Sequence, residues 1–403
     1  MTGSRSLRVR GPRAALLAVA LSAALTGLAA SPATAFAAPA GAAEIDIKYD
    51  EFTLPNGLRV IVHTDRKAPI VAVNLWYHVG SKNEQPGRTG FAHLFEHLMF
   101  QGSENHDAEY FAPFELVGVT DQNGTTNQDR TNYFQNVPTT ALDMALWMES
   151  DRMGHLLGAI NQKSLDEQRG VVQNEKRQGE NQPYGRRINA KIFEALYPAG
   201  HPYNWQVIGS MADLDAATLD DVKTWFKSWY GPNNAVLVLS GDIDVKTAKE
   251  KVTRYFGDIP ASATLADMPT NIPKRDKDTR ETVPDRVPQT RVYRAWPVAE
   301  IGTRDAVLLD LFSQVLGGSA ASRFDMRLVH GDKIADNAAA YTWSSELAGT
   351  FFLMATAKDG VDAAKIEKAM DEELQRLLAE GPTAEELERA KVATRAGFVR
   401  GIE

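Results

Sequence analysis

Three side chains with metal-binding or acid–base chemistry share one short segment of the sequence. His93, Glu96 and His97 are spaced as HxxEH. On a helix they fall within an arc of about 100°, and the two histidines lie one turn apart on the same face. Two neutral imidazoles so placed can bind a single Zn²⁺, and a carboxylate beside them can serve as general base toward water. The spacing therefore predicts a zinc-dependent hydrolytic site.

The rest of this segment has the composition of a helix that packs against a core. A helix from about Gly90 to Phe100 would carry the polar trio on one narrow face and apolar residues elsewhere. The alternative is a solvated helix on which two surface histidines happen to lie near a glutamate. The chain has only eight histidines, and this scarcity favours the metal site over chance.

Strands and helices alternate around this helix. Pro55-Asn56-Gly57 separates two short apolar runs, which indicates a β-hairpin. The predicted strands are Glu51–Leu54, Leu58–His63, Ile70–Val79 and Ala235–Ser240. The further predicted helices are Ala108–Gly118, Thr140–Leu157, Ser164–Glu180 and Val245–Tyr255.

A stretch without periodicity divides the chain. Residues 261–289 are rich in proline, charge and threonine and predict an interdomain linker. Residues 45–260 and 290–403 then form two domains, in keeping with the overall length. If the second domain matched the first in length, it would continue beyond Glu403, so we expect the given sequence to be truncated there.

The segment after the linker repeats the framework of the first half. His93–Met99 aligns with Asp310–Leu316, and Gln168–Glu175 aligns with Glu388–Arg395. The apolar positions are kept, which predicts two related α+β halves, although two amphipathic helices can also look alike by chance. The polar site positions are not kept, so we expect chemistry in the first half alone. Their replacements in the second half are Asp310, Ser313, Gln314 and Arg395.

The first 37 residues predict a secretory signal peptide. Four arginines up to Arg13 precede an apolar run, Ala14–Ala30, and small residues around Ala35 and Ala37 fit cleavage sites. The alternative is a retained membrane anchor, but the run is short and weakly hydrophobic for a span. We therefore expect a secreted, extracellular protein with no membrane attachment after cleavage.

Composition narrows the partners. The chain has no cysteine, which excludes a lipid-anchored lipoprotein and disulfide bonds and requires a proper core. Its formal net charge is −8, before removal of a signal segment that carries only basic charges. This balance argues against nucleic acid or an anionic membrane as the main partner.

Several motifs together resemble one known family, the M16 (pitrilysin or insulinase-like) zinc metallopeptidases. The resemblance is closest to short two-domain members related to the mitochondrial processing peptidase, and it covers nearly the whole mature chain. The segments that carry it are Thr53–Val62, Gly90–Gly102, Asn123–Thr126 with Thr131 and Tyr133, His201–Tyr203 with Ile208-Gly209, Tyr230–Ala235 and Gly241-Asp242.

The resemblance implies roles for residues far from the HxxEH segment. In the family, a glutamate in a pattern like E-R-x-V-V-x-x-E is the third zinc ligand, which implies Glu175 here, with His93 and His97, for one Zn²⁺ per chain. Glu180 is a competitor outside that pattern. The family commonly has an acid seven residues before the ligand, where this chain has Gln168, so the partner of the ligand set is neutral here.

The family resemblance also implies how substrate binds. Asn123 falls in the family's edge strand, to which an extended substrate adds through backbone hydrogen bonds. The alternative for Asn123 is a turn residue before Gly124. Active members present an arginine and a tyrosine from the second half, after a motif represented here by Ser322-Arg323-Phe324, but the corresponding positions are Val329 and Asp336.

These departures lead to a hypothesis about partners. Because the zinc motif is intact and the arginine–tyrosine pair is missing, we expect the zinc-bearing subunit of a heterodimer with a zinc-less relative, or else a homodimer. The expected substrates are peptides or unfolded polypeptides, hydrolysed with Glu96 as general base. The expected fold is α+β, with two homologous halves that each pack helices on a mainly antiparallel sheet around a chamber. The rivals are a noncatalytic scaffold and a processing protease dedicated to one precursor.

Overall fold

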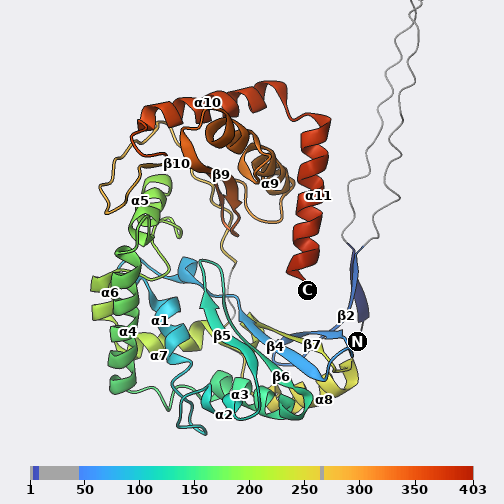
Figure 1. Ribbon diagram of the computed structural model, residues 1–403. Helices are drawn as coiled ribbons and strands as arrows, with labels where there is room; N and C mark the ends of the chain where they lie inside the picture. The colour runs from blue at the N-terminus through green and yellow to red at the C-terminus, as the bar shows by residue number, and fades with distance from the viewer. Residues whose placement is uncertain (1–2, 9–44, 264–266, 403) are drawn as a thin grey trace, which may run out of the picture.

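The structure is a computed structural model that describes residues 3–8, 45–263 and 267–402 (Figure 1). Of the predicted signal peptide, only Gly3–Arg8 is described, as strand β1, and the rest of that segment with its cleavage sites lies outside the described residues. No helix in the described part of the chain has the length and apolar character of a membrane span.

The first half is built on a seven-stranded sheet in the order β1-β2-β3-β7-β4-β6-β5. Neighbouring strands are antiparallel except β3 and β7, which are parallel. β5 lies at one edge of this sheet, so one of its sides has no strand partner among the described residues. The further strands are β2 Asp46–Thr53, β3 Arg59–Thr64, β4 Ile70–Tyr77, β5 Thr120–Thr126, β6 Thr131–Pro138 and β7 Ala235–Gly241.

Alternating buried residues explain why the central strands face a core. In β4, Val71, Val73, Leu75 and Tyr77 are fully buried, and residues two apart lie on the same face of a strand. The helices of the first half are α1 Phe91–Leu98, α2 Ala112–Glu115, α3 Leu142–Gly154, α4 Gln162–Glu180, α5 Arg186–Leu196, α6 Met211–Ala216, α7 Leu219–Trp229 and α8 Val245–Phe256, with short 3-10 turns at Ser81–Asn83, Thr139–Ala141 and Pro232–Asn234.

The predicted hairpin is confirmed, whereas one predicted helix is too long. β2 and β3 pair antiparallel across Pro55-Asn56-Gly57, and Gly57 has a φ of 94°, which a glycine adopts without strain. The helix expected over Ala108–Gly118 is reduced to α2, because the backbone N–H of Tyr110 donates to the carbonyl of Phe100 instead of entering a helix.

The second half repeats part of the first in the same order. In the first half, β4, α1, β5, β6, α3 and α4 occur in this order, with the short helix α2 between α1 and β5. In the second half, β8, α9, β9, β10, α10 and α11 occur in the corresponding order, with a π-helical segment between α9 and β9. The second sheet has the antiparallel order β8-β10-β9, which corresponds to β4-β6-β5. These elements are β8 Arg291–Val298, α9 Arg304–Gly317, a π-helical segment Asp325–Gly331, β9 Ala335–Trp343, β10 Gly349–Ala357, α10 Ala363–Glu380 and α11 Ala384–Gly401.

The repeat extends to helix packing. α1 packs against α4, and α9 packs against α11 in the same way. The expected α+β fold of two related halves, with mainly antiparallel sheets, is therefore confirmed. The described residues of the predicted linker, 261–263 and 267–289, form neither helix nor strand.

The two halves meet through a shared apolar cluster and a buried tyrosine. Phe193 and Tyr197 of the first half pack with Leu347 and Phe352 of the second. The hydroxyl of Tyr203 donates to Asp129 and accepts the backbone N–H of Leu347 at 2.9 Å. Figure 1 shows α5 reaching from the first half toward the second sheet. The two halves are therefore in direct contact.

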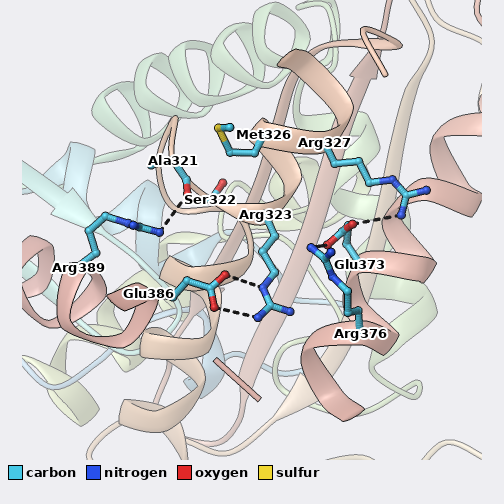
Figure 2. Close-up of a pocket in the computed structure, with 9 residues that line it drawn as sticks. All are labelled: Ala321, Ser322, Arg323, Met326, Arg327, Glu373, Arg376, Glu386 and Arg389. Atoms are coloured by element: carbon cyan, nitrogen blue, oxygen red, sulfur yellow. Dashed lines mark hydrogen bonds and ion pairs between the residues drawn. The ribbon is translucent and has the colours of Figure 1, made fainter. Parts of the chain in front are cut away.

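The Ser322-Arg323-Phe324 motif has a structural role in the second half. The Arg323 guanidinium bonds both oxygens of Glu386 at 2.8 Å, as Figure 2 shows. Glu386 also accepts the backbone N–H of Thr383, the residue that caps α11, so the arginine ties the residues just before the π-helical segment to the start of that helix. This bidentate pair has the geometry in which arginine binds a carboxylate most strongly.

We expect the Arg323–Glu386 pair to stabilise the protein in a pH-dependent way. The hydrogen bond from Arg323 is the main reason that the pKa of Glu386 falls to about 2. A carboxyl whose pKa is lowered on folding contributes stability above its unfolded pKa, near 4.5, and that stability is lost as the pH falls toward 2.

Thermal unfolding followed across this pH window tests the pair. Glu386→Gln is expected to lower the melting temperature at pH 7, and the difference from wild type is expected to shrink as the pH drops below 4.5. The matched control is Glu385→Gln, which removes a neighbouring exposed carboxylate that pairs with Arg389. A Glu386→Gln deficit that stayed constant down to pH 3 would contradict the assignment.

Candidate metal centre

The helix that carries HxxEH is fixed at its first turn. The backbone N–H groups of Gly90 and Ala92 donate to the buried carboxylate of Glu84, at 3.0 and 2.9 Å. Gly90 has a φ of 92°, and a Cβ there would lie 2.9 Å from the carbonyl oxygen of Ile208, so only glycine fits. Burial raises the pKa of Glu84 to about 8. These contacts set the direction in which α1 leaves the loop.

Packing of α1 on α4 brings three metal-binding side chains together. Nε2 of His93 lies 3.7 Å and Nε2 of His97 lies 3.6 Å from the two carboxylate oxygens of Glu175. In the described part of the chain, this is the one group of three histidine or carboxylate residues with ligand atoms within 4.8 Å of one another. Glu180 is instead paired with Lys176 at 2.8 Å on the same helix.

The geometry and chemistry of this group fit zinc. Tetrahedral zinc with bonds of about 2.0–2.1 Å holds its ligand atoms about 3.4 Å apart, which is close to the two distances to Glu175. Two imidazoles and one carboxylate form a typical ligand set for catalytic zinc, with a position left open. Burial is the main reason that the pKa of His93 falls to about 3, so this imidazole is neutral and able to bind metal across the physiological range.

Gln168 orients one of the two histidines. It lies on α4, two turns before Glu175, and its Oε1 is 3.3 Å from Nδ1 of His97. An N–H at Nδ1 that donates to this amide leaves the Nε2 lone pair facing Glu175. Nδ1 of His93 is buried and has no such partner among the described residues. A side-chain partner at Nδ1 therefore orients His97 but not His93 in the described part of the chain.

We expect zinc affinity to respond to Gln168. Gln168→Glu replaces a neutral acceptor with an anionic one, which makes His97 a better ligand, so affinity is expected to rise. Gln168→Ala is expected to lower affinity about 10- to 100-fold. The measurement is competition with a chromophoric chelator, with Gln173→Ala as control, because Gln173 lies on the same helix but bonds Asp215. Equal affinity in wild type and Gln168→Ala would contradict this role.

Glu96 lies on α1 between the two histidines in sequence, and its carboxylate is bonded by a residue of the edge strand β5. Its side chain is buried and accepts a hydrogen bond from the hydroxyl of Thr126 at the end of β5. Burial is the largest cause that raises the pKa of Glu96 to about 7, and the Thr126 hydrogen bond opposes it. A carboxyl with a pKa near neutrality is well matched to proton transfer in both directions.

The structure places Asn123 on the edge strand β5, three residues before Thr126. Its side chain is exposed and accepts the backbone N–H of Gly124 at 2.9 Å. The location agrees with the edge-strand interpretation, whereas the interpretation as a turn residue is wrong, because Asn123 pairs with Phe134 of β6 inside the strand. Its role in substrate binding stays a prediction.

Val329 and Asp336 have structural partners in the second half. Val329 packs against the core of that half, and Asp336 on β9 accepts a hydrogen bond from the side chain of Gln289. The two nearby residues of the right types are also engaged. Arg327 pairs with acids of α10, including Glu373, and Tyr341 stacks on Phe352.

Two contributors to the site have no signature in the sequence. Thr126 lies in a segment that carries the family resemblance, but nothing in its spacing marks it as the partner of Glu96. Glu84 lies in a loop, and a buried carboxylate that binds two backbone N–H groups has no signature in one sequence. Both depend on tertiary packing.

Comparison with known proteins assigns the chain to a family. Residues 59–201 match the family model described as Insulinase (Peptidase family M16), and residues 216–393 match Peptidase M16 inactive domain. The first segment contains the HxxEH motif and Glu175, and the second contains the half without them. The chain belongs to the M16 peptidase family.

Individual relatives agree with this assignment. The zinc protease PqqE of Helicobacter pylori is 29% identical over 364 residues, which cover 88% of this chain and 80% of the relative. A crystal structure of a protease from Helicobacter pylori superposes with a TM-score of 0.81 at 28% identity, covering 87% of this chain and 85% of that one. The first half of the periplasmic protease PqqL from Escherichia coli, at 23% identity, shares the fold, with a TM-score of 0.68, and the match covers 88% of this chain and 77% of that one.

Proposed function

We propose that the chain is an exported zinc-dependent metalloendopeptidase that hydrolyses peptides or unfolded polypeptides. In this proposal His93, His97 and Glu175 hold one zinc ion and Glu96 is the general base. The observation that carries it is the convergence of those three ligand atoms from two helices, with Glu175 lying 78 residues after His97, next to a buried carboxylate with a pKa near 7.

Each residue of the candidate site has a separate role in the proposed hydrolysis. A zinc ion held by His93, His97 and Glu175 would supply Lewis acidity toward a scissile carbonyl and an attacking water molecule. Glu96 takes the proton from the attacking water and passes it to the leaving amine. Thr126 fixes the carboxylate of Glu96 through its hydroxyl, and Gln168 keeps His97 in its ligand orientation.

The first test combines zinc content with hydrolysis of a mixture of quenched-fluorescent peptides. One zinc per purified chain together with turnover that a chelator abolishes is the expected result. A protein without zinc, even after incubation with the metal, would overturn the proposal and favour a noncatalytic scaffold. Export is proposed from the arginine-led apolar segment at the N-terminus, and it is tested by fractionation and N-terminal sequencing of the mature protein.

A second candidate function is the zinc-bearing subunit of a two-chain peptidase. The observation that favours it is that Val329 and Asp336 stand where the family resemblance implies an arginine and a tyrosine. Val329 instead packs against the core of the second half, and Asp336 accepts a hydrogen bond from Gln289. The test compares the purified chain alone with the chain plus a zinc-less relative from the same genome. Efficient turnover by the chain alone would contradict the need for a partner.

A further inference from the structure

A cavity of about 260 Å³ lies directly beside the candidate metal centre. His93 and Thr126 form the wall nearest the site, and Phe193, Trp205 and Trp343 contribute aromatic surface. Trp343 comes from β9 in the second half, whereas the others come from the first. Any peptide bound at the metal centre therefore has one side chain within reach of this cavity.

One cationic side chain of the cavity has no acidic partner among the described residues. Arg186, the first residue of α5, lines the cavity and is half-buried. Its Nη1 is buried without a hydrogen-bond partner, and no acidic side chain among the described residues pairs with its guanidinium. Leaving a buried polar group unpaired is costly, and the cost is larger when the group is charged. A ligand that supplies an anion would remove that cost.

The surroundings hold Arg186 in place. Its side chain lies across Gly179, one turn after Glu175, where a Cβ would come within 2.6 Å of its Cδ. The turn before it is fixed because the backbone N–H of Tyr184 donates to Asp285 at 3.0 Å. An arginine that is oriented before binding gives up less conformational freedom when it pairs with a carboxylate.

We infer that Arg186 is a specificity-determining residue that binds a carboxylate of the substrate next to the scissile bond. The inference rests on the proposed peptidase function, because carboxylates are the anions that every polypeptide carries. The aromatic walls suit the methylene groups of a glutamate, and the guanidinium suits its two oxygens. The same chemistry could come from the C-terminal carboxylate of a short peptide.

Kinetics on a matched peptide set test the inference. The peptides are quenched-fluorescent and identical except for glutamate or glutamine at either residue flanking the cleavage point. Wild type is expected to prefer glutamate at one position by about tenfold or more in kcat/KM, as charged hydrogen bonds allow. Arg186→Gln is expected to reduce this ratio to near one without loss of zinc. An unchanged ratio in Arg186→Gln would overturn the inference.

The neighbouring arginine provides the matched control. Arg187 is exposed, bonds the carbonyl of Pro284 and lies 3.6 Å from Asp285. Arg187→Gln removes the same charge one residue away and is expected to keep the glutamate preference. Gly179→Ala is expected to weaken the preference, because the added methyl group displaces the Arg186 side chain. A lost preference in Arg187→Gln would mean that net charge, rather than Arg186, selects the substrate.

A separate binding experiment distinguishes this inference from the proposed peptidase activity. Dissociation constants for the same peptides are measured on Glu96→Gln, with and without Arg186→Gln, by intrinsic tryptophan fluorescence. Glutamate-selective binding that needs Arg186 supports the inference even if the wild type hydrolyses nothing, and its absence contradicts the inference. A peptide without acidic side chains is tested in two forms, with a free and with an amidated C-terminus. If only the free form depends on Arg186 for binding, the carboxylate that Arg186 binds is the C-terminal one.

Discussion

Replacing Glu96 with glutamine is expected to stop peptide hydrolysis while zinc stays bound. The amide keeps the shape of the side chain and can still accept the hydrogen bond from Thr126, but it cannot take a proton from water. Loss of a general base costs about 10²- to 10⁴-fold in rate. The measurement is kcat on a quenched-fluorescent peptide together with zinc content by mass spectrometry.

The same substitution is expected to stabilise the metal-free protein. Burial raises the pKa of Glu96 to about 7, above its usual value of 4.5, so the folded state binds more protons than the unfolded state between those values. Stability therefore falls as the pH rises through this window. At pH 8 and with a chelator present, Glu96→Gln is expected to melt at a higher temperature than wild type. Retained turnover in Glu96→Gln would exclude Glu96 as the base.

Replacing Glu175 with glutamine is expected to release zinc. Both carboxylate oxygens of Glu175 face the histidine pair, and an amide offers one neutral oxygen and a nitrogen that cannot bind metal. We expect a loss of affinity larger than the about 10- to 100-fold predicted for Gln168→Ala, because a ligand is removed rather than its support. The measurement is zinc content after dialysis against a weak chelator.

The matched control for Glu175 lies on the same helix. Glu180 is paired with Lys176, and Glu180→Gln is expected to retain zinc and turnover. The two variants differ from wild type by the same chemical change, so a general effect of lost negative charge would appear in both. Loss of zinc in Glu180→Gln with retention in Glu175→Gln would reverse the assignment of the third ligand.

The spacing of residues in the sequence predicts the centre of the site. The contacts between residues far apart in the chain cannot be predicted from that spacing. His93 and His97 are one turn apart on a helix, so their proximity follows from sequence spacing and elementary helix geometry. Glu175 approaches them only because α1 packs on α4, and its selection came from the family resemblance. Arg186 and Trp343 join the cavity from separate elements, a convergence that no periodicity reports.

The fold was predictable to the extent that it repeats. Alignment of His93–Met99 with Asp310–Leu316 predicted two related halves, and the shared strand order confirms them. The order itself, with β7 between β3 and β4, depends on long-range pairing that a single sequence does not encode in any local pattern. The helix predicted over Ala108–Gly118 was too long for a similar reason, since the backbone N–H of Tyr110 bonds a residue outside that segment.

If an extended substrate adds to the edge of β5, as the family resemblance implies, the substrate's own local unfolding free energy becomes part of its selection. A segment that pairs with this strand must be extended and must have its backbone N–H and C=O groups free. Segments already committed to a helix or a sheet must first give up those bonds, at a cost that varies along any folded protein. Two sites with identical flanking residues would then be cleaved at rates set by how readily each one melts, so hydrogen-exchange protection in a substrate should rank its cleavage sites.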